Sequence, residues 1–311
     1  MNKFAKRLLV LAVAAVTTAG TFTTAMPVYA AEEETTEAGD DVDITLEDKP
    51  YLALGADLTA DEQHKVLSYM GVEAADFDQY DVVYVSNEEE HKYLDAYVPK
   101  EKIGTRALSS VLVSLTEEGD GLKVSTYNIN YCTAGMYKNA LATAGISDAN
   151  VIVAGPFELS GTAALVGTFE AYEELSGETL DEDVVDAAMD ELVTTGELEQ
   201  SIKGNSQDIE AMIADLKGRM ANGDLDTREQ MEKAIDEYAG KYDLGISKDD
   251  KEKIMDLLEK LQGVDLDWDS IASQAQEWAD KLSNAVDGEG IGAAVKNFFS
   301  KIWDAITSLF E

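Results

Sequence analysis

The sequence YLALGADLTADEQHKVLSYMG, residues 51–71, gives the clearest indication of the fold class of this chain. Its first four residues are apolar and predict a short buried strand. Thr59 and Glu62 then have the spacing of a capping box, in which a hydroxyl and a carboxylate bond the free amide groups at a helix start. Gly71 marks the end of that helix. A strand followed at once by a helix is a unit from which α/β folds are built.

The same alternation continues after this stretch. Strands are predicted at 82–85 and 150–154, and helices at 87–98, 133–144 and 161–175. Residues 105–116 and 122–131 flank the turn Glu118-Gly119-Asp120-Gly121, and this pattern predicts a β-hairpin. We therefore expect residues 51–177 to form an α/β domain, a mixed sheet with flanking helices.

From residue 178 to 287 the pattern changes to helices alone. Apolar residues recur there at spacings of three and four, which is typical of helices that bury one face. Three residue pairs give helix start signals: Thr179 with Glu182, Thr227 with Gln230, and Ser247 with Asp250. We expect this region to be an all-α helical domain.

Residues 1–30 have the pattern of a secretory signal peptide. Basic residues precede the apolar run 8–19, and small residues at 28–30 predict cleavage near Ala30. Residues 31–50 are rich in carboxylates and poor in apolar groups, so we expect an acidic disordered leader. These features predict a secreted protein that is extracellular or associated with the cell wall.

The chain is strongly acidic. It has 24 Lys and Arg against 62 Asp and Glu, a formal net charge of −38. Such a charge repels nucleic acid, which is therefore excluded as a partner, and allows weak calcium binding. Asp265, Asp267 and Asp269 begin like a calcium loop, but Gln276 stands where such a loop needs Glu. We predict no metal site and no cofactor.

Residues suited to catalysis are scarce. Cys132 is the single cysteine, which excludes an internal disulfide, and its place at the end of a strand-like run predicts a buried structural thiol. His64 and His91, the two histidines, lie on polar helix faces and are expected to be solvated. The sequence has no hydrolase motif, so it favours a protein without catalysis.

The ends of the predicted strands suggest one candidate site. If the strands before Gly55, Ser86 and Gly155 are parallel, their carboxyl ends share one edge of the sheet, where helix starts favour a small anion or carboxylate. Polar residues expected there are Asp57, Thr59, Ser86, Asn87, Ser160 and Thr162. The alternative is that these residues simply cap helices. Arg106 would join the site as a carboxylate binder, or else form a structural ion pair.

Residues 288–311 predict an amphipathic C-terminal helix. Its apolar face comprises Val295, Phe298, Phe299, Ile302, Trp303, Ile306, Leu309 and Phe310. Aromatic residues on such a face are typical of helices that bind a membrane surface. The alternative is a helix that packs on the protein's own core or on a partner. The oligomeric state is left open.

Several blocks resemble a known family, including LGADLT at 54–59, IGTRALSS at 103–110, LATAG at 141–145, SGTAAL at 160–165 and ELVTTGEL at 191–198. Together they resemble the YpuA-like family of exported proteins from Gram-positive bacteria, a domain family of unknown function. The resemblance covers residues 51–265 and implies export and a shared fold, but it assigns no catalytic residue. We therefore expect a non-catalytic protein of the cell envelope that binds or interacts there. The alternatives are a small-ligand or peptide-binding domain that uses the strand-end crevice, and, ranked lower, a cell-wall hydrolase.

Overall fold

A computed structural model describes residues 37–42, 44, 49–204 and 206–285. Its centre is a six-stranded mixed sheet with the strand order β1-β5-β6-β4-β2-β3. The strands are β1 (Glu37–Gly39), β2 (Tyr51–Gly55), β3 (Asp81–Val85), β4 (Ser110–Leu115), β5 (Leu122–Ile129) and β6 (Ala149–Leu159). β4 runs antiparallel to both of its neighbours, whereas β2 pairs in parallel with β3 and β5 pairs in parallel with β6. The predicted mixed α/β sheet is confirmed.

The predicted hairpin between 105–116 and 122–131 is wrong. β4 and β5 are not neighbours, because β6 lies between them, antiparallel to β4 and parallel to β5. Residues 149–154 of β6 are all buried, and a strand that is covered on both faces belongs inside a sheet. The turn instead bonds to the start of β6, since the amides of Gly119 and Gly121 each donate to Asp148 Oδ1 at 2.9 Å.

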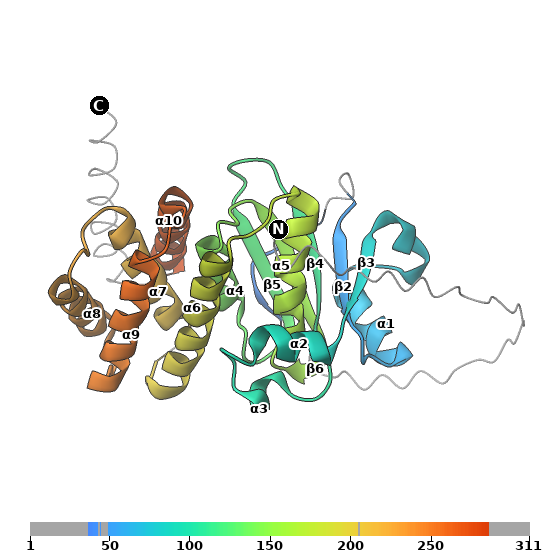
Figure 1. The fold of residues 1–311 in the computed structure, drawn as a ribbon, viewed down its shortest axis with the longest axis horizontal. Helices are drawn as coiled ribbons and strands as arrows, with labels where there is room; N and C mark the ends of the chain where they lie inside the picture. The colour runs from blue at the N-terminus through green and yellow to red at the C-terminus, as the bar shows by residue number, and fades with distance from the viewer. Residues whose placement is uncertain (1–36, 43, 45–48, 205, 286–311) are drawn as a thin grey trace, which may run out of the picture. The chain divides into compact units, whose positions relative to one another are not determined.

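Helices cover both faces of the sheet (Figure 1). On one face, α1 (Ala60–Tyr69) packs Val66 and Leu67 against Leu52 and Leu54 of β2. On the other face are α2 (Asn87–Leu94), α4 (Ala134–Thr143) and α5 (Thr162–Ser176), which share a second apolar cluster. Two short elements complete this part of the chain. In sequence, η2 (Ala74–Gln79) lies between α1 and β3, and α3 (Lys100–Ile103) lies between α2 and β4.

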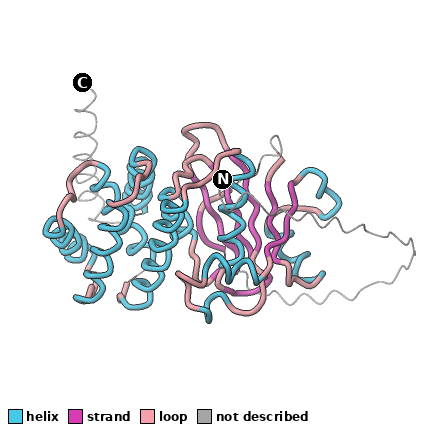
Figure 2. Tube along the Cα trace, viewed as in Figure 1, coloured by secondary structure: helices cyan, strands magenta, loops and turns pink. Residues whose placement is uncertain are grey.

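The C-terminal part of the described chain is helical, as predicted (Figure 2). Its helices are α6 (Glu182–Ser201), α7 (Ser206–Ala221), α8 (Arg228–Tyr242), α9 (Lys248–Gln262) and α10 (Trp268–Ala285). Thr227 and Ser247 are the N-caps of α8 and α9, which confirms these two predicted helix starts, and each forms a capping box. The start predicted at Thr179 is wrong, because Asp181 caps α6 through its bond to the Asp183 amide.

The helical part joins the α/β part through α6. Met189 and Leu192 belong to the apolar cluster under the sheet, whereas Leu198 belongs to the cluster formed by the later helices. One helix therefore contributes to both cores, and the boundary placed at 178 stays a prediction.

Part of the predicted disordered leader is ordered. β1 pairs with β5, and Asp40 accepts a bond from the Val124 amide at 3.2 Å while its amide donates to Val124 O at 2.8 Å. Asp40 also lies 3.0 Å from Lys138 Nζ of α4. For residues 37–42 the prediction was wrong, because backbone pairing and a specific ion partner offset the acidic composition.

Candidate functional site

The carboxyl ends of β2, β3, β5 and β6 lie at one edge of the sheet. These four strands run in the same direction, because β2 and β6 are each antiparallel to β4. The strand predicted to end before Gly155 continues to Leu159. Asn128 lies at an irregularity in β5 with φ 58°, and its side-chain amide donates to Gly155 O at 3.0 Å. This kink and extension bring the end of β6 beside residues 129–132, since the Asn130 amide donates to Leu159 O.

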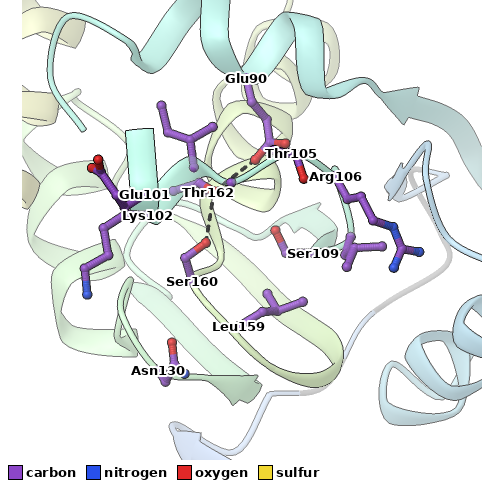
Figure 3. Close-up of a pocket in the computed structure, with 13 residues that line it drawn as sticks. Glu90, Glu101, Lys102, Thr105, Arg106, Ser109, Asn130, Leu159, Ser160 and Thr162 are labelled. Carbon is purple, nitrogen blue, oxygen red and sulfur yellow. Dashed lines mark hydrogen bonds between the residues drawn. The ribbon is translucent and has the colours of Figure 1, made fainter. Parts of the chain in front are cut away.

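A pocket of about 320 Å³ opens at this edge (Figure 3). Its walls come from α2, α3, the segment 104–109, the end of β5 and the turn from β6 into α5. The lining residues are Glu90, Glu101, Lys102, Ile103, Gly104, Thr105, Arg106, Leu108, Ser109, Asn130, Leu159, Ser160 and Thr162.

Glu90 is the buried acid of the pocket. Its residue surface is 1% exposed, and its carboxyl oxygens accept bonds from Asn87 Nδ2 at 3.1 Å and from Thr162 Oγ1 at 2.9 Å. Ser160 Oγ lies 3.1 Å from Thr162 Oγ1 and extends this hydrogen-bonded chain, as Figure 3 shows. Burial outweighs these bonds and raises the pKa of Glu90 to about 7.

Arg106 is a rim residue with partners in the protein. Its guanidinium donates to Asp57 O at 2.8 Å and pairs with Glu62 Oε2 at 3.1 Å, and the side chain is 45% exposed. Asp57 Oδ2 also accepts a bond from the Ala107 amide at 2.8 Å. Asp57 and Arg106 therefore hold the segment after Gly104 against the start of α1. The ion pair with Glu62 is the structural alternative foreseen for Arg106.

The remaining predicted residues divide between the pocket and helix caps. Ser160 and Thr162 line the pocket. Asn87 does not line it, but its side-chain amide donates to Glu90, which does. Thr59 and Ser86 are N-caps of α1 and α2, and they do not line this pocket. For these two residues the capping alternative describes the structure, because their hydroxyls accept amide bonds at the helix starts.

Lys102 is a pocket cation that the sequence analysis missed. Its Nζ lies 4.7 Å from the ring centroid of Tyr131. Within the described residues, no carboxylate lies within ion-pair distance of this ammonium group. Its charge therefore faces an aromatic ring, and the residue forms part of the pocket wall.

His91 connects α2 to the pocket rim. Its Nδ1 lies 2.7 Å from Asp95 Oδ1 and its Nε2 lies 3.0 Å from Gly104 O. Both neighbours are acceptors, so they favour the doubly protonated ring, and the bond to Asp95 raises the pKa of His91. The expectation of a simply solvated His91 is wrong, whereas His64 is exposed as expected.

Glu90, Lys102, Ser109 and Asn130 were absent from the predicted site. One signal existed for Glu90: it precedes Leu94 by four residues, and both lie on the buried face of α2. The hydroxyl of Ser109 accepts a bond from the Ala164 amide at 2.9 Å and so fixes the start of α5 beside the pocket.

The other predictions about chemistry have mixed outcomes. Cys132 is fully buried, as predicted, and burial raises the pKa of its thiol. Among the described residues there is no group of three or more His, Cys, Asp or Glu placed to hold a metal, and weak calcium binding stays a prediction. No helix in the described part of the chain is long and apolar enough to cross a membrane. The apolar face predicted for 295–310 lies outside the described residues.

Comparison with known proteins identifies relatives without an assigned activity. The family model described as "Protein of unknown function (DUF1002)" matches residues 54–278. The "Uncharacterized protein YpuA" of Bacillus subtilis is 40% identical over 264 residues, which cover 84% of this chain and 89% of that protein. No solved structure matches.

Proposed function

The chain belongs to the DUF1002 family of proteins of unknown function, and from this premise we propose that it is an exported, non-catalytic binding protein of the cell envelope. In this proposal the pocket around Glu90 holds a small polar ligand. No activity is known for the family that could be assigned to this chain, so the proposal depends on the chemistry of the site.

The observation that carries the proposal is a buried carboxyl group in the wall of an open pocket. Glu90 is bonded only to neutral donors, Asn87 and Thr162. A buried acid without a cation is costly, which explains its raised pKa. A group whose pKa is strongly perturbed and that lies in a cleft is a candidate for a functional site. A ligand that donates to Glu90 would repay that cost.

Binding accounts for the pocket better than hydrolysis does. A carboxylate-only hydrolase needs two carboxyl groups facing each other across the bond that is cut. Glu101, the second acid in the pocket wall, is exposed, whereas Glu90 is buried. The hydrolase stays the lower-ranked alternative. Location in the envelope is supported by the signal-peptide pattern of residues 1–30.

The experiment is a thermal-shift screen of the protein from Ala31 onward. The screen covers amino acids, simple sugars, amines and carboxylic acids at millimolar concentration. At least one compound is expected to raise the melting temperature, and Glu90→Gln is expected to abolish that shift. Glu88→Gln is the matched control, because Glu88 is on the same helix but exposed. A screen without any shift, or a shift that survives in Glu90→Gln, would contradict a binding function at this pocket.

A second candidate function rests on the sequence of residues 288–311. The spacing of Phe298, Phe299, Ile302 and Trp303 favours a helix that binds a membrane surface or a partner. Co-sedimentation with neutral and anionic vesicles tests it, using the protein from Ala31 beside a version that ends at Gly288. Binding by the longer protein alone supports a membrane anchor. Failure of both versions to bind excludes a lipid-binding role.

A further inference from the structure

The pocket holds an acid that has no cationic partner. The two basic residues after Glu90 in α2 are directed elsewhere: His91 contacts Asp95 and Gly104 O, and Lys92 donates to Tyr93 Oη at 3.2 Å. No Lys, Arg or His nitrogen of the described chain lies within ion-pair distance of the Glu90 carboxyl group. Its bonds from Asn87 and Thr162 leave further lone pairs on the carboxylate.

The same pocket holds a cation that has no acidic partner. Lys102 lines the wall without a carboxylate in ion-pair distance among the described residues, although acids outnumber bases in this chain by 62 to 24. Arg106 differs, because Glu62 already offsets its charge. Figure 3 shows Lys102 and Arg106 on opposite sides of the chain formed by Glu90, Thr162 and Ser160.

The rest of the wall suits a small, partly polar molecule. Ser160 and Asn130 offer hydrogen-bonding groups, and Ser109 keeps its hydroxyl hydrogen for a ligand because its oxygen accepts from Ala164. Leu108 and Leu159 offer apolar contacts to carbon atoms. A volume of about 320 Å³ is at the small end for ligand pockets and matches an amino acid or a short peptide better than a long polymer.

One ligand class satisfies both unpaired charges. We propose, on the basis of the proposed binding function, that the pocket takes a small zwitterion, a free amino acid or short peptide. Its ammonium group binds Glu90, and its carboxylate group binds Lys102. The ammonium group also has the hydroxyls of Ser160 and Thr162 beside it as acceptors. A neutral sugar or a simple amine would leave one or both charges unpaired, which costs binding free energy.

Proton release gives this proposal a signature beyond affinity. Burial raises the pKa of Glu90 to about 7, so near neutral pH a fraction of the molecules carries a proton there. An ammonium group beside the carboxylate lowers that pKa, and binding then expels the proton. The affinity is therefore expected to fall about tenfold when the pH drops from about 8 to about 6.

Isothermal titration of the protein from Ala31 tests the ligand class directly. The probes are alanine and alanyl-alanine in both enantiomers, with alaninamide lacking the carboxylate and N-acetylalanine lacking the ammonium group. At least one zwitterion is expected to bind, with proton release seen as a heat that depends on the ionisation enthalpy of the buffer. Glu90→Gln and Lys102→Met are each expected to weaken binding by about tenfold or more. Glu88→Gln and Lys123→Met, both at exposed positions outside the pocket, are expected to leave it unchanged.

The outcomes separate this inference from the proposed function. If a sugar, amine or simple acid binds in a Glu90-dependent manner while the zwitterions do not, the ligand class is wrong and the binding function stands. If alaninamide binds as well as alanine and Lys102→Met has no effect, the assignment of Lys102 is overturned. If no compound of the titration or the thermal-shift screen binds, both proposals fail.

Discussion

Two buried glutamates of this protein have opposite surroundings. Glu191 of α6 and Lys217 of α7 are both 0% exposed, and their charged atoms lie 2.6 Å apart. Lys217 Nζ also donates to Asn139 O at 2.9 Å and to Thr143 Oγ1 at 3.0 Å, and Thr143 donates to Glu191. Glu90 is equally buried but has only neutral donors and faces a pocket.

The difference separates a group that holds the fold together from one that is available to a ligand. The Glu191–Lys217 pair lies where α6 and α7 pack against α4, and both of its members have bonding partners within the protein. The α/β part, through α4, and the helices α6 and α7 are therefore joined by a buried polar contact. Among the described residues the carboxyl group of Glu90 has no cationic partner, and it lies in the wall of the pocket. This arrangement lowers the stability of the fold but leaves the group available to a ligand.

The largest expected effect comes from breaking the buried pair. Lys217→Met leaves Glu191 as a buried acid without its cation and is expected to destabilise the protein by about 3–5 kcal/mol. The measurement is urea unfolding followed by circular dichroism. The double variant Glu191→Leu/Lys217→Met should regain most of the loss, because Thr143 can then bond the carbonyl of Asn139 one turn earlier. A single variant as stable as the original protein would contradict the structural role of the pair.

Removing the charge of Glu90 should stabilise the protein, in contrast to Lys217→Met. The folded-state pKa of about 7 exceeds the ordinary value of 4.5, so the folded protein loses stability as the pH rises through this interval. In Glu90→Gln the side-chain amide of Asn87 can rotate so that its oxygen accepts a hydrogen bond from the new amide. The substitution is expected to stabilise the protein by about 2 kcal/mol at about pH 8 and to have no such benefit at about pH 5. Urea unfolding at both pH values measures this. A Gln variant that is less stable at the higher pH would show that Glu90 is a structural group like Glu191.

Residues 37–42 extend the comparison to a largely buried ion pair, Asp40 with Lys138. Asp40→Ala removes the contact to Lys138 and the bond from the Val124 amide, and is expected to cost about 1.5 kcal/mol. Thermal unfolding of the protein from Ala31 provides the measurement, and Asp41→Ala, at an exposed neighbouring position, is the control. Equal melting temperatures for the two variants would mean that residues 37–42 add nothing to the fold.

The smallest effect is expected at the rim. Arg106→Ala breaks the half-exposed ion pair with Glu62, which should cost about 0.5 kcal/mol. Binding in the pocket should be nearly unchanged, because Arg106 is already paired while Lys102 is not. The measurement is titration with whichever probe binds the original protein. A loss of binding as large as that of Lys102→Met would transfer the carboxylate-binding role to Arg106.

Local patterns predicted much of the fold and part of the site. The helix starts at Thr59, Thr227 and Ser247 were identified from residue type and spacing, since a cap depends on a few neighbouring residues. Ser160 and Thr162 were correctly predicted near the site because they follow a strand, and the direction of that strand sets the sheet edge at which it ends. Glu90 was missed because it follows two other glutamates in the sequence, and only the packing of α2 distinguishes the inward one.

The amino-acid pattern alone predicts the acidic charge, the change from an α/β part to an all-α part, and most of the individual helices and strands. Three features become visible only in the folded chain: β6 separates β4 from β5, Asp40 pairs with Lys138, and Glu90 and Lys102 line one pocket. The physical reason is the distance along the chain over which each interaction acts. Helix caps and apolar periodicity act within a few residues, whereas strand pairing and the burial of a charge depend on groups that are distant in the chain.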